Sequence, residues 1–214
     1  MKNNDQVFCK ENLLDKKSSF LSPNFIAICL LIIFLMVSTT SFFSLVIISG
    51  SSMYPTLSDG DVVIMVKTEN VKRGDVVVID GEKKVQKNGQ QSYEWIIKRI
   101  IAVGGDTIDI KDDGAVYIKF KGQSTFEPLD EEYLETNTKT EQGNGYLTYP
   151  FTVPEGELFF LGDNRGISKD SRSEFGTCKQ SQIKGIVRQW AINSRGFFTA
   201  IYKFENRILS FFNK

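Results

Sequence analysis

The sequence predicts a mainly β protein, in which an antiparallel β-sheet domain is tethered by one N-terminal transmembrane helix. Two observations predict this class. The first is an uncharged apolar stretch near the N-terminus that is long enough to cross a membrane. The second is a series of short runs rich in β-branched and aromatic residues, separated by turn residues, that fills most of the remaining chain. Strands that follow one another so closely leave no room for crossover helices, so the sheet should be antiparallel.

The apolar stretch lies between Lys17 and Asp59, which have no charged residue between them. A helix over residues 25–47 would be about 34 Å long, and the hydrocarbon core of a bilayer is about 30 Å thick. We therefore predict a transmembrane helix over residues 24–48. The alternative is a cleaved secretory signal, but the apolar part of such a signal usually has only about 7–15 residues. The stretch also contains hydroxyl residues that can bond to the carbonyls of their own helix: Ser38, Thr39, Thr40, Ser41 and Ser44.

The distribution of basic residues predicts the orientation in the membrane. Four lysines, Lys2, Lys10, Lys16 and Lys17, precede the apolar stretch, whereas the first basic residue after it is Lys67. Loops rich in lysine and arginine stay on the cytoplasmic side. We therefore expect a single-pass protein of the cell membrane, with residues 1–23 in the cytoplasm and residues 49–214 forming one extracytoplasmic domain.

Short apolar runs after the anchor predict the strands of this domain. Two polar stretches interrupt them. Residues 81–92 contain an Asn-Gly turn signal and predict a hairpin loop, and residues 122–149 predict either a small subdomain or a mobile lid. We assign residues 107–157 to a small inserted subdomain. The predicted strands are Val62–Val66, Val76–Ile79, Tyr93–Val103, Thr107–Ile110, Val116–Phe120, Leu158–Leu161 and Ile183–Ala191.

The C-terminal tail, residues 197–214, carries apolar residues at helical spacing. They predict a surface amphipathic helix close to the membrane, while the charges between them forbid a second span. A last strand with a frayed apolar end is the alternative, because the segment is short and follows a glycine. The apolar positions are Phe197, Ile201, Phe204, Ile208 and Phe211.

Composition excludes several functions. Twenty-six basic residues balance twenty-six acidic ones, so no overall field draws the chain to nucleic acid. The predicted topology puts Cys9, Cys29 and Cys178 in cytoplasm, bilayer and exterior, so no intramolecular disulfide is expected. Without histidine or paired cysteines, a zinc site would need carboxylates alone, which suit that metal poorly. We expect neither a metal nor another cofactor.

The absence of histidine also narrows the possible nucleophilic chemistry. Ser52 lies in Gly50–Leu57, just beyond the predicted membrane exit, in a turn that Pro55 would help to fix. Because no imidazole can remove its proton, a lysine is the obvious base. Lys98 lies in the apolar run from Trp95 to Val103, where burial would penalise the ammonium, lower the pKa and make a neutral amine available. A lysine on the solvent face of that strand is the alternative.

A third motif, Gly162–Arg172, reads GDNRGISKDSR and concentrates charged and hydroxyl residues directly after an apolar run. Aspartate and arginine side chains can lock a loop through paired hydrogen bonds, and a serine from such a loop could orient a lysine amine. A charged surface turn is the alternative interpretation of this motif.

Together these motifs resemble the type I signal peptidases, membrane-bound Ser/Lys proteases that remove signal peptides from exported proteins. The resemblance is closest to the short Gram-positive forms, and it implies the antiparallel β fold shared by these peptidases and the self-cleaving repressors. It covers most of residues 49–176. The four matching segments are Gly50–Leu57, Arg73–Val78, Lys98–Asp106 and Gly162–Arg172.

By motif position, the resemblance implies Ser52 as nucleophile and Lys98 as general base. Ser168 would hydrogen-bond to the Lys98 amine. Substrate binding and the oxyanion hole would involve Gly50, Met53 and Pro55, and where some relatives have a serine that helps to form this hole, the chain has Gly50. Two ion pairs, Arg99 with Asp163 and Asp170 with Arg172, would brace the site.

The function implied is that of a membrane-bound serine endopeptidase that cleaves signal peptides from exported preproteins, after small residues at positions −1 and −3. Its partners would be preprotein signal peptides, membrane lipids and the secretion translocon, with no nucleic acid. One alternative is a catalytically silent, membrane-tethered relative that acts as an assembly or chaperone factor for exported proteins. Another is a self-cleaving repressor, but the anchor occupies the position where its DNA-binding domain would lie.

Overall fold

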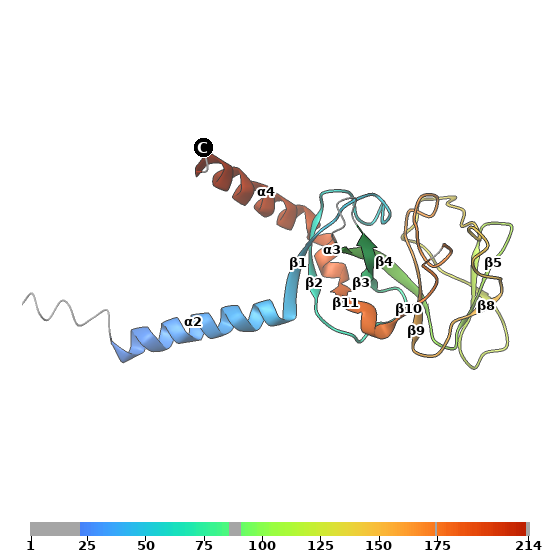
Figure 1. The fold of residues 1–214 in the computed structure, drawn as a ribbon, viewed down its shortest axis with the longest axis horizontal. Helices are drawn as coiled ribbons and strands as arrows, with labels where there is room; N and C mark the ends of the chain where they lie inside the picture. The colour runs from blue at the N-terminus through green and yellow to red at the C-terminus, as the bar shows by residue number, and fades with distance from the viewer. Residues whose placement is uncertain (1–21, 86–90, 174, 213–214) are drawn as a thin grey trace, which may run out of the picture. The chain divides into compact units, whose positions relative to one another are not determined.

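The computed structural model describes residues 22–85, 91–173 and 175–212, and the chain forms two compact units, residues 1–42 and residues 43–214 (Figure 1). The described part of the first unit is the helix α2 (Pro23–Phe42). Its 20 residues make it long and apolar enough to cross a membrane. Thr39, Thr40 and Ser41 return their hydroxyl hydrogen bonds to carbonyls one turn earlier in the helix, as expected for hydroxyls in an apolar environment.

The predicted helix boundary at residue 48 differs from the structure, because α2 ends at Phe42 and residues 43–47 form the strand β1 (Phe43–Ile47). β1 pairs antiparallel with β2 (Val62–Val66) along its whole length, from Phe43 opposite Val66 to Ile47 opposite Val62. Hydropathy does not separate a helix from an apolar strand, and here the hydrogen-bonding partner decides the conformation. The sequence did not reveal this pairing, because residues 48–61 separate the two strands.

The larger sheet of the second unit has seven strands, and each strand pairs antiparallel with its neighbours. Sequence order and sheet order differ, since β11 lies between β2 and β3. This insertion brings the end of the domain back beside its beginning. The strands are, in sheet order, β1, β2, β11 (Ile183–Val187), β3 (Val76–Val85), β4 (Gln91–Val103), β9 (Glu157–Leu161) and β10 (Cys178–Lys179).

A second sheet of four strands is built from residues within 107–152. β5 and β6 form a hairpin with Thr107 opposite Lys119, and each carries one short strand on its outer edge. The excursion over residues 122–149 contributes β7 and otherwise consists of turns and irregular chain. In sheet order the strands are β7 (Glu127–Pro128), β6 (Val116–Lys119), β5 (Thr107–Ile110) and β8 (Phe151–Thr152).

Buried apolar side chains form three clusters, and one of them supports the site described below. Met53 and Leu57 of the segment after β1 are fully buried in that cluster, together with Val63 and Val76 of the larger sheet. A second cluster lies between Phe159 and the strands of the smaller sheet. The serine-containing segment is therefore anchored by its own apolar residues.

Two predictions near the C-terminus are resolved. The predicted strand Ile183–Ala191 is wrong in its second half, because β11 ends at Val187 and Gln189–Asn193 form the helix α3, which buries Ala191 and Ile192. A short 3₁₀ turn, η2 (Gln180–Gln182), precedes β11. The tail forms a helix, α4 (Arg195–Phe212), rather than a strand. Cys9 and the four lysines before α2, which entered the predictions, lie outside the described residues.

Candidate active site

Lys98 and Ser52 meet inside the domain although 46 positions separate them in sequence. Lys98 lies on β4, opposite Val77 of β3, and its side chain is buried, with 4% of the residue exposed. Its Nζ is 2.8 Å from Ser52 Oγ and 3.0 Å from the carbonyl oxygen of Ile97. The solvent-facing alternative for Lys98 is thus wrong, and an amine lies within hydrogen-bonding distance of an alcohol in a largely apolar environment.

Buried side chains anchor the turn that carries Ser52 in the apolar core. Met53 and Leu57 are completely buried, and the Leu57 amide donates to the Met53 carbonyl over 3.0 Å. Before the serine, Gly50 adopts a φ of 87°, a conformation that glycine reaches without strain. Its amide donates to Asp59 Oδ1 over 2.7 Å. The two sides of the turn are therefore fixed independently.

Gly50, Met53 and Pro55, which were predicted for substrate binding or the oxyanion hole, do not line the groove that contains Ser52. The Met53 side chain is a core residue, and the Gly50 amide is already bound by Asp59. Pro55 is half-buried in the turn and does not line the groove beside Ser52. The sequence places all three residues in the turn of Ser52, but it does not encode which side of the turn each one faces.

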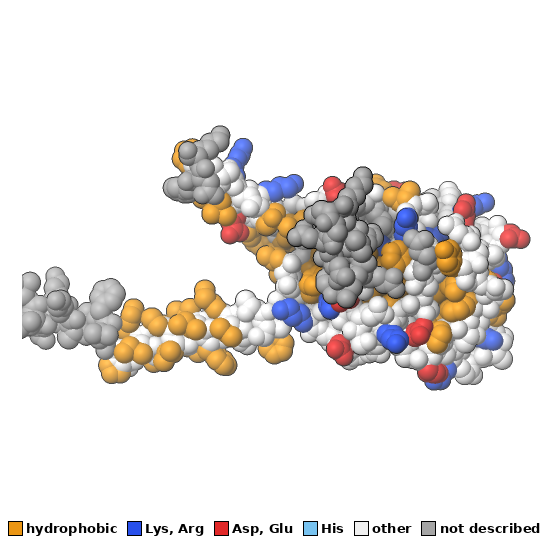
Figure 2. All heavy atoms as spheres, viewed as in Figure 1, with side chains coloured by type: hydrophobic (Ala, Val, Ile, Leu, Met, Phe, Trp, Pro, Cys, Tyr) orange, Lys and Arg blue, Asp and Glu red, His pale blue; other side chains and the backbone are white. Residues whose placement is uncertain are grey.

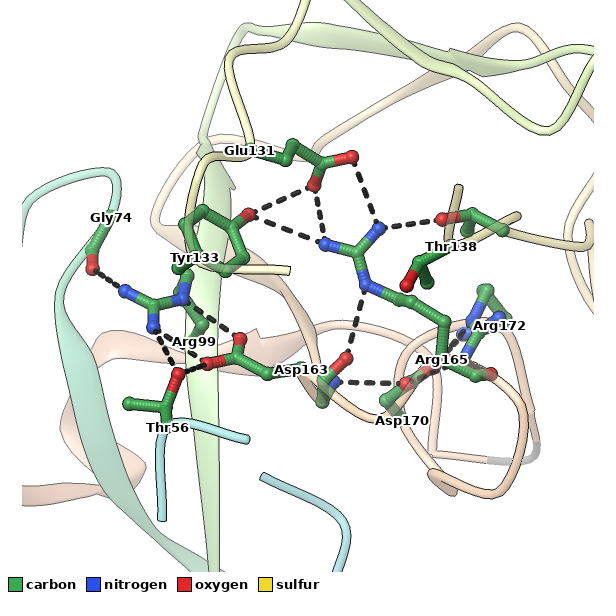
Figure 3. Close-up of polar contacts among 12 residues, drawn as sticks. Thr56, Gly74, Arg99, Glu131, Tyr133, Thr138, Asp163, Arg165, Asp170 and Arg172 are labelled. Atoms are coloured by element: carbon green, nitrogen blue, oxygen red, sulfur yellow. Dashed lines mark hydrogen bonds and ion pairs between the residues drawn. The ribbon is translucent and has the colours of Figure 1, made fainter. Parts of the chain in front are cut away.

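Both predicted ion pairs are present, one between Arg99 of β4 and the loop Gly162–Arg172 and one within that loop (Figure 3). The Arg99 guanidinium donates to both carboxylate oxygens of Asp163, over 2.8 and 2.6 Å, and also to the carbonyl of Gly74. Asp170 pairs with Arg172 in the same paired manner and also accepts from the Gly162 amide over 3.0 Å. Because Arg99 follows Lys98 on β4, the first pair ties the lysine strand to the loop.

The same loop grips the serine turn through Asn164. The Asn164 amide donates to the Ser52 carbonyl over 3.0 Å, and its side-chain Nδ2 donates to the Ser51 carbonyl over 3.2 Å. Thr56, at the other end of the turn, donates its hydroxyl to Asp163 over 2.5 Å. The serine backbone is thus held by the loop on both sides. The sequence did not single out Asn164 or Thr56, although both belong to the matching motifs.

The predicted hydrogen bond between Ser168 and Lys98 is absent. Ser168 Oγ is buried and has no hydrogen-bond partner among the described residues. Its side chain instead packs against Gly162, where an added Cβ would lie 2.1 Å from Ser168 Oγ and 2.5 Å from the Ser52 carbonyl oxygen. The physical reason is that Lys98 Nζ turns towards Ser52 and Ile97.

A second charged cluster, which no sequence motif predicted, joins the loop to the excursion 122–149 (Figure 3). The Arg165 side chain is fully buried and pairs with Glu131, and it donates to Thr140 over 2.6 Å. Burial alone lowers the pKa of Arg165, but Glu131, with smaller contributions from Tyr133 and Asp163, more than offsets this, so the net shift is upward. Tyr133 lies against the Arg99 guanidinium at 3.8 Å, and burial raises its pKa. Only the density of charge in the loop signalled such a cluster.

The segment Arg73–Val78, one of the four motifs found in the sequence, also contributes an ion pair. Arg73 donates to both carboxylate oxygens of Asp106, each over 2.6 Å. Burial by itself raises the pKa of Asp106, yet hydrogen bonds from Arg73 and from the amides of Val103 and Lys121 outweigh it and hold the pKa below its usual value. The pair therefore joins the segment before β3 to the turn after β4 and adds to the rigidity of the lysine strand.

A groove of about 760 Å³ runs past Ser52 and Lys98. Leu45, Val46 and Ile47 of β1, with Ile48 directly after it, form one wall, and residues Trp95–Lys98 of β4 contribute another. The walls are mostly apolar. Ser52 and Lys98 are both among the lining residues, so a chain lying in the groove would reach the serine hydroxyl. Within the described residues, no group of three or more potential metal ligands comes together.

Comparison with known proteins decides the family. Residues 22–191 match the family described as signal peptidase, peptidase S26. The chain belongs to this family. It is 39% identical over 150 residues to Signal peptidase I T of Bacillus subtilis (strain 168), covering 66% of this chain and 70% of that protein. It is 38% identical over 157 residues to Signal peptidase IB of Staphylococcus aureus, covering 65% and 73%.

Among solved structures, a signal peptidase I from Enterococcus faecalis V583 aligns with 30% identity and a TM-score of 0.40, covering 56% of this chain and 97% of the other. Family membership identifies this S26 protein as a serine peptidase. The two antiparallel sheets confirm the predicted mainly β fold, and the family match confirms the recognition of the family. The part of the chain beyond residue 191, which includes α4, lies outside the family match.

Proposed function

We propose that this peptidase cleaves signal peptides from exported preproteins with Ser52 as nucleophile and Lys98 as general base. The observation that carries the proposal is the 2.8 Å separation of Lys98 Nζ and Ser52 Oγ in a buried setting. Family membership supports the substrate class, since the relatives are named signal peptidases. The reaction is the hydrolysis of a peptide bond.

The proposed mechanism begins with a neutral lysine. Burial disfavours the ammonium, so the Lys98 amine can accept the Ser52 proton as Ser52 Oγ attacks the scissile carbonyl. The lysine, now protonated, donates to the leaving amine as the peptide bond breaks. Water then attacks the remaining acyl-serine ester while Lys98 takes a proton from that water. Lys98 passes that proton to Ser52 Oγ as the ester bond breaks, which releases the carboxylic acid and restores the serine. Arg99, Asp163, Asp170 and Arg172 act as positioning residues.

The developing oxyanion requires a main-chain donor. The Gly50 amide is bound to Asp59, whereas the Ser52 amide donates to no described residue. We assign the Ser52 amide as one donor. Such a preorganised donor typically contributes on the order of 10²-fold or more to turnover. The groove beside it would hold an extended substrate chain, with small side chains at positions −1 and −3.

The proposed location follows from α2. We propose that α2 anchors the protein in the cell membrane, that residues 1–23 are cytoplasmic, and that residues 49–214 act outside with β1 leading into the domain. Substrates that are anchored in the same membrane by their own apolar segments would then present their cleavage sites to Ser52 at a fixed distance from the membrane surface. Lipids of that membrane and the secretion translocon are the expected partners.

The experiment is cleavage of a purified preprotein with an Ala-x-Ala site, in detergent, followed by N-terminal sequencing of the product. Wild type, Ser52→Ala and Lys98→Ala are compared with Ser51→Ala, a matched change at the neighbouring exposed serine. We expect cleavage after the second alanine by wild type and Ser51→Ala alone. Turnover by Ser52→Ala would refute the nucleophile assignment. Failure of a folded wild-type protein on several such substrates would favour the silent, membrane-tethered relative.

A further inference from the structure

The helix α4 carries a stripe of large apolar side chains that no described residue covers. Phe197, Ile201, Phe204 and Ile208 follow one another at intervals of three and four residues, which puts them on one face of the helix. Their exposed fractions are 64%, 49%, 65% and 41%. Burying such a stripe would stabilise the protein, so its exposure indicates that the stripe contacts a protein or a membrane that the structure does not contain.

The rest of α4 is polar and partly basic. Lys203 and Arg207 lie on one flank of the stripe, and Glu205 lies on the other. Figure 2 shows the basic side chains projecting from one side of the helix and apolar side chains from another. A helix with an apolar face, a polar face and lysine or arginine beside the boundary is typical of a helix that lies in a membrane interface. Long basic side chains can reach up from there to the lipid phosphates.

The start of α4 is fixed to the domain close to β1. The Val62 amide donates to Thr199 Oγ1 over 2.8 Å, and Arg195 pairs with Asp61 at 3.2 Å. Val62 pairs with Ile47, the last residue of β1. Ile47 lies four residue steps along β1 from Phe43, about 13 Å, so these contacts hold the start of α4 beside the end of β1 that is farther along the chain from α2. From Thr199 to Phe212 the helix runs a further ~20 Å.

We propose that α4 is a second, peripheral membrane contact of this peptidase. It lies in the interface of the bilayer that α2 anchors, with the stripe Phe197, Ile201, Phe204 and Ile208 among the upper acyl chains and Lys203 and Arg207 at the phosphates of anionic lipids. A bilayer is favoured over a protein partner because α2 and the short strand β1 tether the start of α4 to a membrane. The inference rests on the membrane anchoring and is independent of the roles of Ser52 and Lys98.

The experiment uses the full-length protein in which Cys9, Cys29 and Cys178 are replaced by serine. A single cysteine is introduced as Phe204→Cys on the stripe or, as the matched control, Asn206→Cys on the opposite face of the same helix. Each carries an environment-sensitive fluorophore. The proteins are reconstituted by α2 into vesicles of phosphatidylcholine and phosphatidylglycerol that contain lipids with a nitroxide on the acyl chain. Quenching by the nitroxide and by aqueous iodide is measured for both positions.

We expect the label at position 204 to be quenched several-fold more strongly by the nitroxide lipid, and less by iodide, than the label at position 206. Equal iodide quenching at both positions would refute the proposal. Protection at position 204 without nitroxide quenching, lost when the lipid-to-protein ratio is raised, would assign the stripe to a second copy of the chain instead. Far-UV circular dichroism of the same samples shows whether the labelled proteins are folded, so a fault in the catalytic assignment would not be mistaken for a fault here.

Discussion

At the scale of single residues, the unusual feature is a buried lysine in contact with an alcohol. Lys98 is almost fully buried, yet its amine touches the Ser52 hydroxyl and a main-chain carbonyl. A lysine in this setting is useful as a base because its neutral form can be reached, which is not true of arginine. The proposed role therefore depends on the proton affinity of the side chain and not on its charge or length.

Replacing Lys98 with arginine tests this distinction. We expect Lys98→Arg to lower kcat/KM on a preprotein by on the order of 10³-fold or more, because the guanidinium cannot give up its proton. The matched control is Lys111→Arg at an exposed position, which should keep full activity. The measurement is the initial rate of product formation by purified, folded protein. Turnover by Lys98→Arg close to that of wild type would overturn the general-base assignment.

Cys178 is a buried residue whose thiol has a shifted pKa. Burial raises the pKa of its thiol to about 12, and the residue packs in the third apolar cluster beside Phe160. Since the raised pKa keeps the thiol protonated at any pH well below 12, the reactive thiolate is almost absent at pH 8. We expect iodoacetamide to leave Cys178 unmodified in the native protein at pH 8 and to modify it in denaturant, as followed by mass spectrometry. Rapid native labelling would contradict the buried placement.

At the scale of elements, the loop Gly162–Arg172 holds the serine turn, and Gly162 is where the two approach most closely. An added Cβ there would lie 2.5 Å from the Ser52 carbonyl oxygen, so something must move. We expect Gly162→Ala to lower kcat by about 10²-fold, because a displacement of about 1 Å in a reacting group can cost that much. In the same loop, a Cβ at Gly166 meets no atom within 4 Å, so Gly166→Ala is the control. Equal rates for the two variants would mean that the turn adapts.

The buried pair of Arg165 and Glu131 makes the excursion part of the folded site. The Arg165 side chain is fully buried and that of Glu131 is 14% exposed, so Glu131→Gln would leave a buried guanidinium without its counter-charge. We expect this change to lower the free energy of unfolding by about 3–5 kcal/mol. The same substitution in the exposed pair of Lys121 and Glu155 should cost about 0–1 kcal/mol. Urea unfolding followed by fluorescence measures both, and similar losses would contradict the role of burial.

Elements also differ in how far sequence could predict them. β2 and β5 were predicted with their observed bounds, because β-branched runs between turn residues determine a strand locally. β1 was mistaken for helix because its conformation depends on β2, which hydropathy does not reveal. The ion pair of Arg99 and Asp163 followed from the resemblance, whereas that of Arg165 and Glu131 joins two loops whose approach no local pattern encodes. Ser168 was placed in the right loop, but its rotamer depends on packing against Gly162.

At the scale of the whole molecule, β1 joins the two units and belongs to the second. Its residues Leu45, Val46 and Ile47 line the groove, and Ile48 is buried in the cluster beneath Ser52. A boundary drawn from hydropathy at residue 48 would therefore remove one wall of the groove together with the membrane anchor. A boundary at Phe43 would remove α2 alone and leave the second compact unit intact.

Two truncations separate these alternatives. A chain that starts at Phe43 should cleave a short soluble peptide within a few-fold of the full-length rate, because the groove and the core are complete. A chain that starts at Ser49 should lose nearly all activity, since β2 then has no outer neighbour and the groove lacks its first wall. On a preprotein embedded in vesicles, the chain from Phe43 should be at least about tenfold slower than the full-length protein, because α2 no longer supplies a high effective concentration. Full peptide activity from Ser49 onward would mean that β1 is dispensable, and equal rates on the embedded substrate would mean that the anchor contributes nothing to encounter.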